Sequence, residues 1–144
     1  MVIGLHHAGF VVEDLERAVA FYRDVVGLEV RSRYERIGAG IEHVIGYEGT
    51  HLTIAHVGAP GGAHTLELIQ YLNPPPDARS TEERSVLGAT HLAIQVDDIE
   101  ESFARLVAGG AKRLNPPIEL APGRTACYLQ DPDGNWLELI QITE

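Results

Sequence analysis

The sequence predicts an α+β protein made of two tandem βαβββ modules. Two observations carry this prediction. The pentapeptide Leu-Glu-Leu-Ile-Gln occurs twice in the 144 residues, at 66–70 and at 137–141. Each copy comes after an apolar, strand-like segment that carries a histidine, His7–Phe10 in the first case and His91–Ile94 in the second. The chain therefore contains an internal repeat, with one histidine and one glutamate in each copy.

The first module starts with an apolar run over residues 4–12, which suits a buried strand. Asp14 is the expected N-cap of the next helix, because its side-chain oxygen can accept from amides of the first turn. Apolar residues continue at helical spacing to Val26, and Gly27 is expected to end the helix as a C′ residue. Three strand-like segments follow, at 28–36, 50–57 and 64–72.

The second module repeats this order. A strand is expected at 90–96, and Asp97 or Asp98 caps the helix that follows. The helical stripe runs over Ile99–Val107 and stops at Gly109-Gly110. The last three strands are expected at 111–114, 124–130 and 135–142. Asp-Pro-Asp-Gly at 131–134 is a tight-turn sequence that joins the last two strands as a hairpin.

The two modules differ in length at one place. His7 and Glu67 are 60 residues apart, whereas His91 and Glu138 are 47 apart, and an insertion at 37–49 accounts for the difference. Apolar residues at positions 41, 44 and 45 favour a short helix there. This helix would either cap the edge of the sheet or form a wall or lid over a pocket, and the pattern does not separate the two roles.

We expect a single domain over residues 1–144, with module 1 at 1–72 and module 2 at 90–144. A linker at 73–89 joins them. It starts with Asn-Pro-Pro-Pro, which favours a stiff, extended conformation where the chain leaves module 1. Arg79 and Arg84 in this linker are either simply solvated or meet an anionic substrate.

The composition excludes several classes of protein. The formal net charge of −10 argues against a nucleic-acid-binding protein and against binding to an anionic membrane surface. Cys127 is the single cysteine, so no intrachain disulfide can form. No apolar run approaches the length of a transmembrane helix, and no signal-peptide pattern opens the chain, so we expect a cytoplasmic protein.

The repeated histidines and glutamates favour a metal site. Because side chains alternate across a strand, Glu67 and Glu138 lie on the face away from their flanking leucines. Taken singly, a strand histidine is more often a core or edge residue, and a strand glutamate usually points to solvent. Their recurrence at equivalent positions changes this balance, since pseudo-twofold pairing would bring His7, Glu67, His91 and Glu138 to one point. Two imidazoles and two carboxylates suit a divalent cation.

The other side chains near this face are less specific. Tyr71 and Trp136 lie on the same faces as the glutamates and would line a substrate pocket, although bulky aromatic residues there are also ordinary packing. The remaining histidines do not fall on repeat-equivalent positions, and we expect them at the surface or behind the ligands. They are His6, His43, His51, His56 and His64.

Several motifs together point to a known group: His7-Ala8-Gly9-Phe10, Asp14-Leu15, Gly27-Leu28, Leu66-Glu67-Leu68, His91 with Val96-Asp97-Asp98, and Asp131-Pro132-Asp133-Gly134-Asn135-Trp136-Leu137-Glu138-Leu139. In these motifs the whole chain resembles the vicinal oxygen chelate superfamily, which includes glyoxalase I, methylmalonyl-CoA epimerase, extradiol dioxygenases, and fosfomycin and bleomycin resistance proteins. The resemblance implies that the paired modules form an open, curved mixed sheet around a metal site. It also implies a homodimer.

The resemblance further implies a ligand set and a reaction. His7, Glu67, His91 and Glu138 would hold one divalent ion, with Zn, Ni, Co, Mn and Fe(II) all compatible. A small-molecule substrate with adjacent oxygens would chelate the metal, which acts as a Lewis acid. Proton transfer next to a carbonyl would then proceed through an enediolate or enolate, as in a lyase or isomerase, with Glu138 or Glu67 moving the proton.

Departures from the family patterns narrow the choice. Val11 and Tyr71 stand where glyoxalase I of the bacterial type anchors glutathione, and the catalytic glutamate of the epimerase could only correspond to Glu42. Two alternatives stay open. An extradiol-type dioxygenase would hold Fe(II) through His7, His91 and Glu138, with Glu67 off the metal. A non-catalytic, antibiotic-binding resistance protein would hold no metal.

Overall fold

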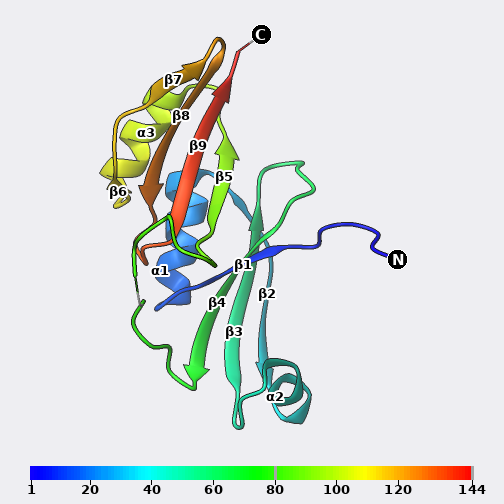
Figure 1. The fold of residues 1–144 in the computed structure, drawn as a ribbon. Helices are drawn as coiled ribbons and strands as arrows, with labels where there is room; N and C mark the ends of the chain where they lie inside the picture. Colours follow the sequence, from blue (N-terminus) through cyan, green and yellow to red (C-terminus); the bar gives the residue numbers. More distant parts are fainter. Residues whose placement is uncertain (80, 144) are drawn as a thin grey trace. The chain divides into compact units, whose positions relative to one another are not determined.

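Residues 1–79 and 81–143 are described by the structure, which is a computed structural model. The chain divides into two compact units, Met1–Ala78 and Arg79–Glu144. Each unit has its own mixed sheet, and the helices and strands follow in the order shown in Figure 1. The α+β fold class expected from the repeat is confirmed.

The sheet of the first unit has the strand order β1-β4-β3-β2. The outer strand β1 pairs with β4 in parallel, and the other neighbours are antiparallel. The elements are β1 (Ala8–Val11), α1 (Leu15–Ala20), the π-helix η1 (Phe21–Val26), β2 (Glu29–Ile37), α2 (Ala39–Ile45), β3 (His51–Gly58) and β4 (Leu66–Asn73).

The first helix starts and ends where the sequence predicts. Asp14 accepts a hydrogen bond at Oδ1 from the Arg17 amide at 2.8 Å, and Gly27 takes the left-handed φ of 94° that favours glycine. The winding changes to a π-helix at Phe21, which the periodicity did not indicate. Phe21 and Tyr22 are adjacent and both buried, so the change occurs where two large neighbouring rings must enter the core.

The insertion at 37–49 contains the short helix that its apolar spacing predicts. This helix, α2, connects β2 to β3, and Figure 1 shows it at the end of that hairpin. None of its residues is buried, and Val44 is largely exposed. Glu42 accepts a hydrogen bond from the Gly49 amide at 3.1 Å, so its carboxylate helps to hold its own loop.

Leucines on one face of the first sheet form the core of the unit. Leu66 and Leu68 on β4 are buried, and α1 packs across β3 and β4 with Leu15 and Val19 also buried. Glu67 lies on the opposite face, as the strand alternation predicts.

The second unit repeats the topology of the first. Its strand order is β5-β9-β8-β6, and β7 also pairs with β8. The outer strand β5 is parallel to β9, as β1 is to β4. The elements are β5 (His91–Gln95), α3 (Ile99–Ala108), β6 (Lys112–Arg113), β7 (Ile118–Ala121), β8 (Arg124–Gln130) and β9 (Trp136–Ile142).

The second unit contains one strand that the sequence did not indicate. The segment expected to be a strand at 111–114 pairs over only two residues, and β7 provides the longer partner of β8. All four residues of β7 are exposed, and Pro116-Pro117 precede it. A short, exposed edge strand after two prolines lacks the buried apolar face on which strand prediction depends.

The hairpin between β8 and β9 is fastened by Asp131. This side chain is fully buried and accepts hydrogen bonds from the amides of Asp133 and Asn135 and from Asn135 Nδ2, all at 2.8–2.9 Å. Three donors on one carboxylate explain why a charged residue is tolerated inside the turn. The predicted hairpin is confirmed.

Cys127 is predicted to resist alkylation while the protein is folded. The side chain is buried, and this burial raises the pKa of its thiol to about 11. Because the thiolate is the nucleophile, iodoacetamide at pH 8 should modify the native protein very slowly and the urea-unfolded protein quickly. Mass spectrometry over time measures both rates. Equal rates in the two states would contradict the burial of this thiol.

Among the residues that the structure describes, none of the helices combines the length and the apolar character needed to cross a membrane.

Candidate functional site

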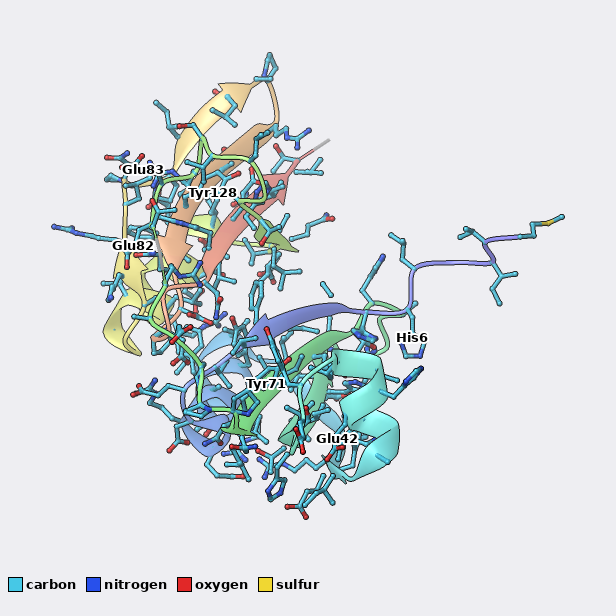
Figure 2. All side chains as sticks on the ribbon, turned by 60° about the horizontal axis from the view of Figure 1, so that its bottom comes forward. His6, Glu42, Tyr71, Glu82, Glu83 and Tyr128 are labelled. Atoms are coloured by element: carbon cyan, nitrogen blue, oxygen red, sulfur yellow. The ribbon has the colours of Figure 1, made fainter. Side chains whose placement is uncertain are left out.

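The first histidine–glutamate pair lies at the start of β1. His7 precedes this strand, and its Nε2 is 3.4 Å from Oε1 of Glu67 on the neighbouring β4. The Glu67 side chain is only 12% exposed. The ring of His6, on the segment before β1 (Figure 2), meets His7 through an Nδ1–Nδ1 contact of 2.7 Å. That contact occupies His7 Nδ1 and leaves Nε2 directed at the carboxylate.

Two further side chains hold the other oxygen of Glu67. His56 on β3 is the register partner of Glu67, and its Nε2 lies 2.8 Å from Oε2. Tyr34 on β2 donates to the same oxygen at 3.2 Å and lies 3.1 Å from His56 Nε2. Ligand atoms of His7, His56 and Glu67 all fall within 4.8 Å of one another, a spacing that could hold a metal ion.

His56 lies behind the proposed ligands, one of the two places expected of it, and contacts the Glu67 carboxylate directly. The sequence did not single it out from the other four histidines. Strand alternation could have indicated this position, because it puts His56 on one face of β3 with Ile54 and Leu52. Antiparallel pairing of β3 with β4 then brings that face to Glu67.

The surroundings of Tyr34 keep its hydroxyl protonated. Burial raises its pKa above the ordinary value, and the negative charge of Glu67 and the hydrogen bond to it raise the pKa further. Tyr34 is therefore a hydrogen-bond donor to the carboxylate at neutral pH.

The second pair has the equivalent arrangement in the second unit. His91 Nε2 lies 3.2 Å from Oε2 of Glu138, whose side chain is 15% exposed. Tyr128 on β8 is the register partner of Glu138, so it takes the place that His56 has in the first unit. Burial raises the pKa of Tyr128, and the charge of Glu138 and a hydrogen bond to it raise the pKa further.

The structure thus brings the four predicted ligands together as two pairs, His7 with Glu67 and His91 with Glu138, each inside one unit. Bonds from a small divalent ion to nitrogen and carboxylate oxygen are about 2.0–2.2 Å long, so neighbouring ligands of one ion lie roughly 3.0–3.4 Å apart. The separations of 3.4 Å and 3.2 Å both fall within this spacing. The donor set in each unit therefore fits a divalent metal.

The two aromatic residues expected near the site have different surroundings. Tyr71, labelled in Figure 2, is half-buried on β4 and pairs in register with Leu52. Trp136 is 7% exposed, and its Nε1 donates to the Glu82 carbonyl at 3.1 Å. Trp136 and His91 line a cavity of about 330 Å³.

Comparison with known proteins supports the resemblance drawn from the sequence motifs. Residues 4–139 match the family model of the Glyoxalase/Bleomycin resistance protein/Dioxygenase superfamily, which confirms the resemblance expected from the sequence. A glyoxalase family protein from Bacillus cereus has a similar solved structure, with a TM-score of 0.92 and 26% identity over 100% of this chain and 97% of that one.

Two curated relatives with named activities are similar over most of their length. A 2-epi-5-epi-valiolone epimerase from Actinomyces sp. is 29% identical over 97% of this chain and 80% of its own. A lactoylglutathione lyase from Neisseria meningitidis is 27% identical over 95% of this chain and 89% of its own.

Proposed function

Because this chain belongs to the Glyoxalase/Bleomycin resistance protein/Dioxygenase superfamily, we propose that it is a metal-dependent enzyme that moves a proton next to a carbonyl group. The observation that carries the proposal is the pair of equivalent His–Glu contacts, each with a largely buried carboxylate. The lyase and epimerase activities of the named relatives support this class of reaction, a lyase or isomerase step on a small molecule with adjacent oxygens.

In this proposal His7, Glu67, His91 and Glu138 hold one divalent cation. Two neutral imidazoles and two carboxylates balance its charge, and Zn, Ni, Co, Mn and Fe(II) all accept such mixed ligands. When bound, the cation stabilises the negative charge that develops on the substrate oxygens. Support for sharing one cation comes from the repeat equivalence of the pairs and from the superfamily, whose members include enzymes with this type of ligand set.

We assign proton transfer to Glu138 rather than Glu67. Glu67 is held on one oxygen by both His56 and Tyr34. Glu138 instead accepts a hydrogen bond from the Tyr128 hydroxyl. This hydroxyl can rotate away when the carboxylate moves. The less constrained carboxylate is better suited to take a proton from carbon and return it.

Elemental analysis and proton exchange test this function. The purified protein should contain about one divalent metal per chain, or regain it after reconstitution. Solvent deuterium should then enter the carbon next to the carbonyl in at least one member of a panel of 2-oxo acids and acyl thioesters, measured by NMR. A protein that cannot be loaded with metal would contradict the enzyme and leave the antibiotic-binding alternative.

His56→Leu is predicted to weaken metal binding by roughly 10–100-fold. The change removes a group that orients the Glu67 carboxylate while keeping the side chain's bulk and the fold. Competition with a chromophoric chelator measures the dissociation constant. His51→Leu, on the same strand but paired with Glu35, is the matched control and should leave the constant unchanged. Equal affinities in wild type and His56→Leu would show that His56 does not support the metal site.

A second candidate function is favoured by one observation. His56 and Tyr34 already occupy one oxygen of Glu67, as expected if Glu67 stays off the metal. Fe(II) held by His7, His91 and Glu138 would then be the two-His-one-carboxylate set of oxygen-activating enzymes. Oxygen consumption with catechols by the Fe(II)-loaded protein, retained in Glu67→Gln, would support the dioxygenase. Metal loss in Glu67→Gln would contradict it.

A further inference from the structure

A cavity beside His91 is the part of the second unit that the proposed metal chemistry leaves unexplained. Its volume is about 330 Å³, enough for part of a small metabolite. Six residues line it: Arg84, Ala89, Thr90, His91, Tyr128 and Trp136. One wall therefore comes from the segment before β5, and the rest comes from β5, β8 and β9.

Arg84 is the cation of this cavity. Its guanidinium carbon lies 4.4 Å from the centre of the Trp136 ring, a cation–π contact. Trp136 is itself fixed, because it is buried and its Nε1 donates to the Glu82 carbonyl. Figure 2 labels Glu82, Glu83 and Tyr128, which mark this segment and β8. The aromatic platform restricts the side chain of Arg84 before any ligand arrives.

The donors of the Arg84 guanidinium have no partner among the residues that the structure describes. Within residues 1–79 and 81–143, the guanidinium makes neither a hydrogen bond nor an ion pair. Its neighbours differ: Arg79 donates to Asn135 Oδ1 at 2.8 Å, and Glu82 accepts from Gln130 Nε2 at 3.3 Å. Glu83 lines an adjacent cavity of about 210 Å³ instead. In a chain of net charge −10, Arg84 is a local positive group whose donors are not taken up by any described residue.

The charge of Arg84 also affects Tyr128, a side chain that contacts the proposed metal ligand Glu138. It acts on the Tyr128 hydroxyl, whose pKa it lowers against the larger opposing effects of burial and Glu138. Tyr128 in turn hydrogen-bonds Glu138. The lining of the cavity therefore includes both Arg84 and His91, and His91 in turn contacts Glu138.

We propose that Arg84 binds an oxyanion of the substrate, a carboxylate or a phosphate, while the carbonyl end of the same molecule lies at His91 and Glu138. This inference rests on the proposed function, because it names the substrate class for that site. The planar guanidinium can donate two parallel hydrogen bonds to either anion, which a lysine cannot do. The substrate is thus a small anionic carbonyl compound.

Hydroxamates, which carry adjacent oxygens, test the proposal without turnover. Co(II)-loaded protein is titrated with acetohydroxamate, with malonyl, succinyl and glutaryl monohydroxamates, with their terminal amides, and with phosphonate analogues. Visible absorption of Co(II) reports binding. We expect at least one carboxylate or phosphonate to bind roughly tenfold tighter than its matched amide, about 1.4 kcal/mol. Whichever series shows the larger preference over its amides, the carboxylates or the phosphonates, identifies the anion that Arg84 binds.

Variants of Arg84 decide the cause of that preference. Arg84→Met keeps an apolar stem on Trp136 and should remove the anion preference while acetohydroxamate binds as in wild type. Arg84→Lys should keep part of the preference. Arg124→Met, an exposed arginine on β8, is the matched control and should keep all of it.

The outcomes separate the two proposals. An anion preference that is absent in wild type, or that survives in Arg84→Met, would overturn the Arg84 site and leave the metal function standing. Failure of every hydroxamate, acetohydroxamate included, to change the Co(II) spectrum would overturn the metal function and the Arg84 proposal with it.

Discussion

Glu138→Gln is expected to lower the rate of carbon–deuterium exchange by about 10²–10⁴-fold, the usual contribution of a positioned acid–base group. Glutamine keeps the shape of the side chain and an oxygen for the metal but cannot take up a proton. The loss of exchange should therefore exceed the loss of bound metal. NMR follows the exchange, and elemental analysis of the same sample measures the metal.

Two matched variants sharpen this prediction. Glu67→Gln should lose metal at least as readily as Glu138→Gln, but the metal-loaded fraction should keep more of the exchange activity. Glu100→Gln, on the exposed face of α3, should change neither quantity. If the two ligand variants lost exchange activity equally per bound metal, Glu138 would not be the proton-transferring residue.

Leu68→Ala is expected to reduce the free energy of unfolding by about 2–5 kcal/mol. Leu68 is 0% exposed in the core of the first unit, so truncation loses its apolar burial and leaves a cavity. Urea denaturation monitored by circular dichroism measures the change. Leu72→Ala on the same strand is the control: its side chain is 45% exposed, and it should cost well under half as much. Similar losses for the two variants would contradict the assigned core face.

Repetition explains why so much of this fold could be predicted from the sequence. The two copies of Leu-Glu-Leu-Ile-Gln form equivalent strands with equivalent neighbours. The leucines could therefore be assigned to the buried face, and the glutamates to the opposite face, in both modules. The two His–Glu contacts followed from the same equivalence. Asp14, Gly27 and Asp131 mark element ends through local chemistry, and each does so in the structure.

What the sequence missed depends on contacts that do not repeat. His56 and Tyr128 are the register partners of Glu67 and Glu138, but they differ in residue type. Comparison of the two copies therefore did not indicate that His56 contacts Glu67. The strand β7 is exposed on every residue and has no apolar face to reveal it. The role of Arg84 depends on a linker that packs on Trp136, a tertiary contact without a local pattern.

The parallel pairing at the outside of each sheet has a kinetic consequence. Ala8 pairs with Leu66, 58 residues away along the chain, whereas β3 and β4 form a local hairpin. Closing the longer loop costs more chain entropy, so the hairpin should form first and β1 should dock last. His7 and Glu67 belong to the two partners of that final step. In stopped-flow refolding with Co(II), the absorption of the bound metal should therefore rise with the slowest phase, after the secondary structure has formed; a rise in an earlier phase would contradict this order.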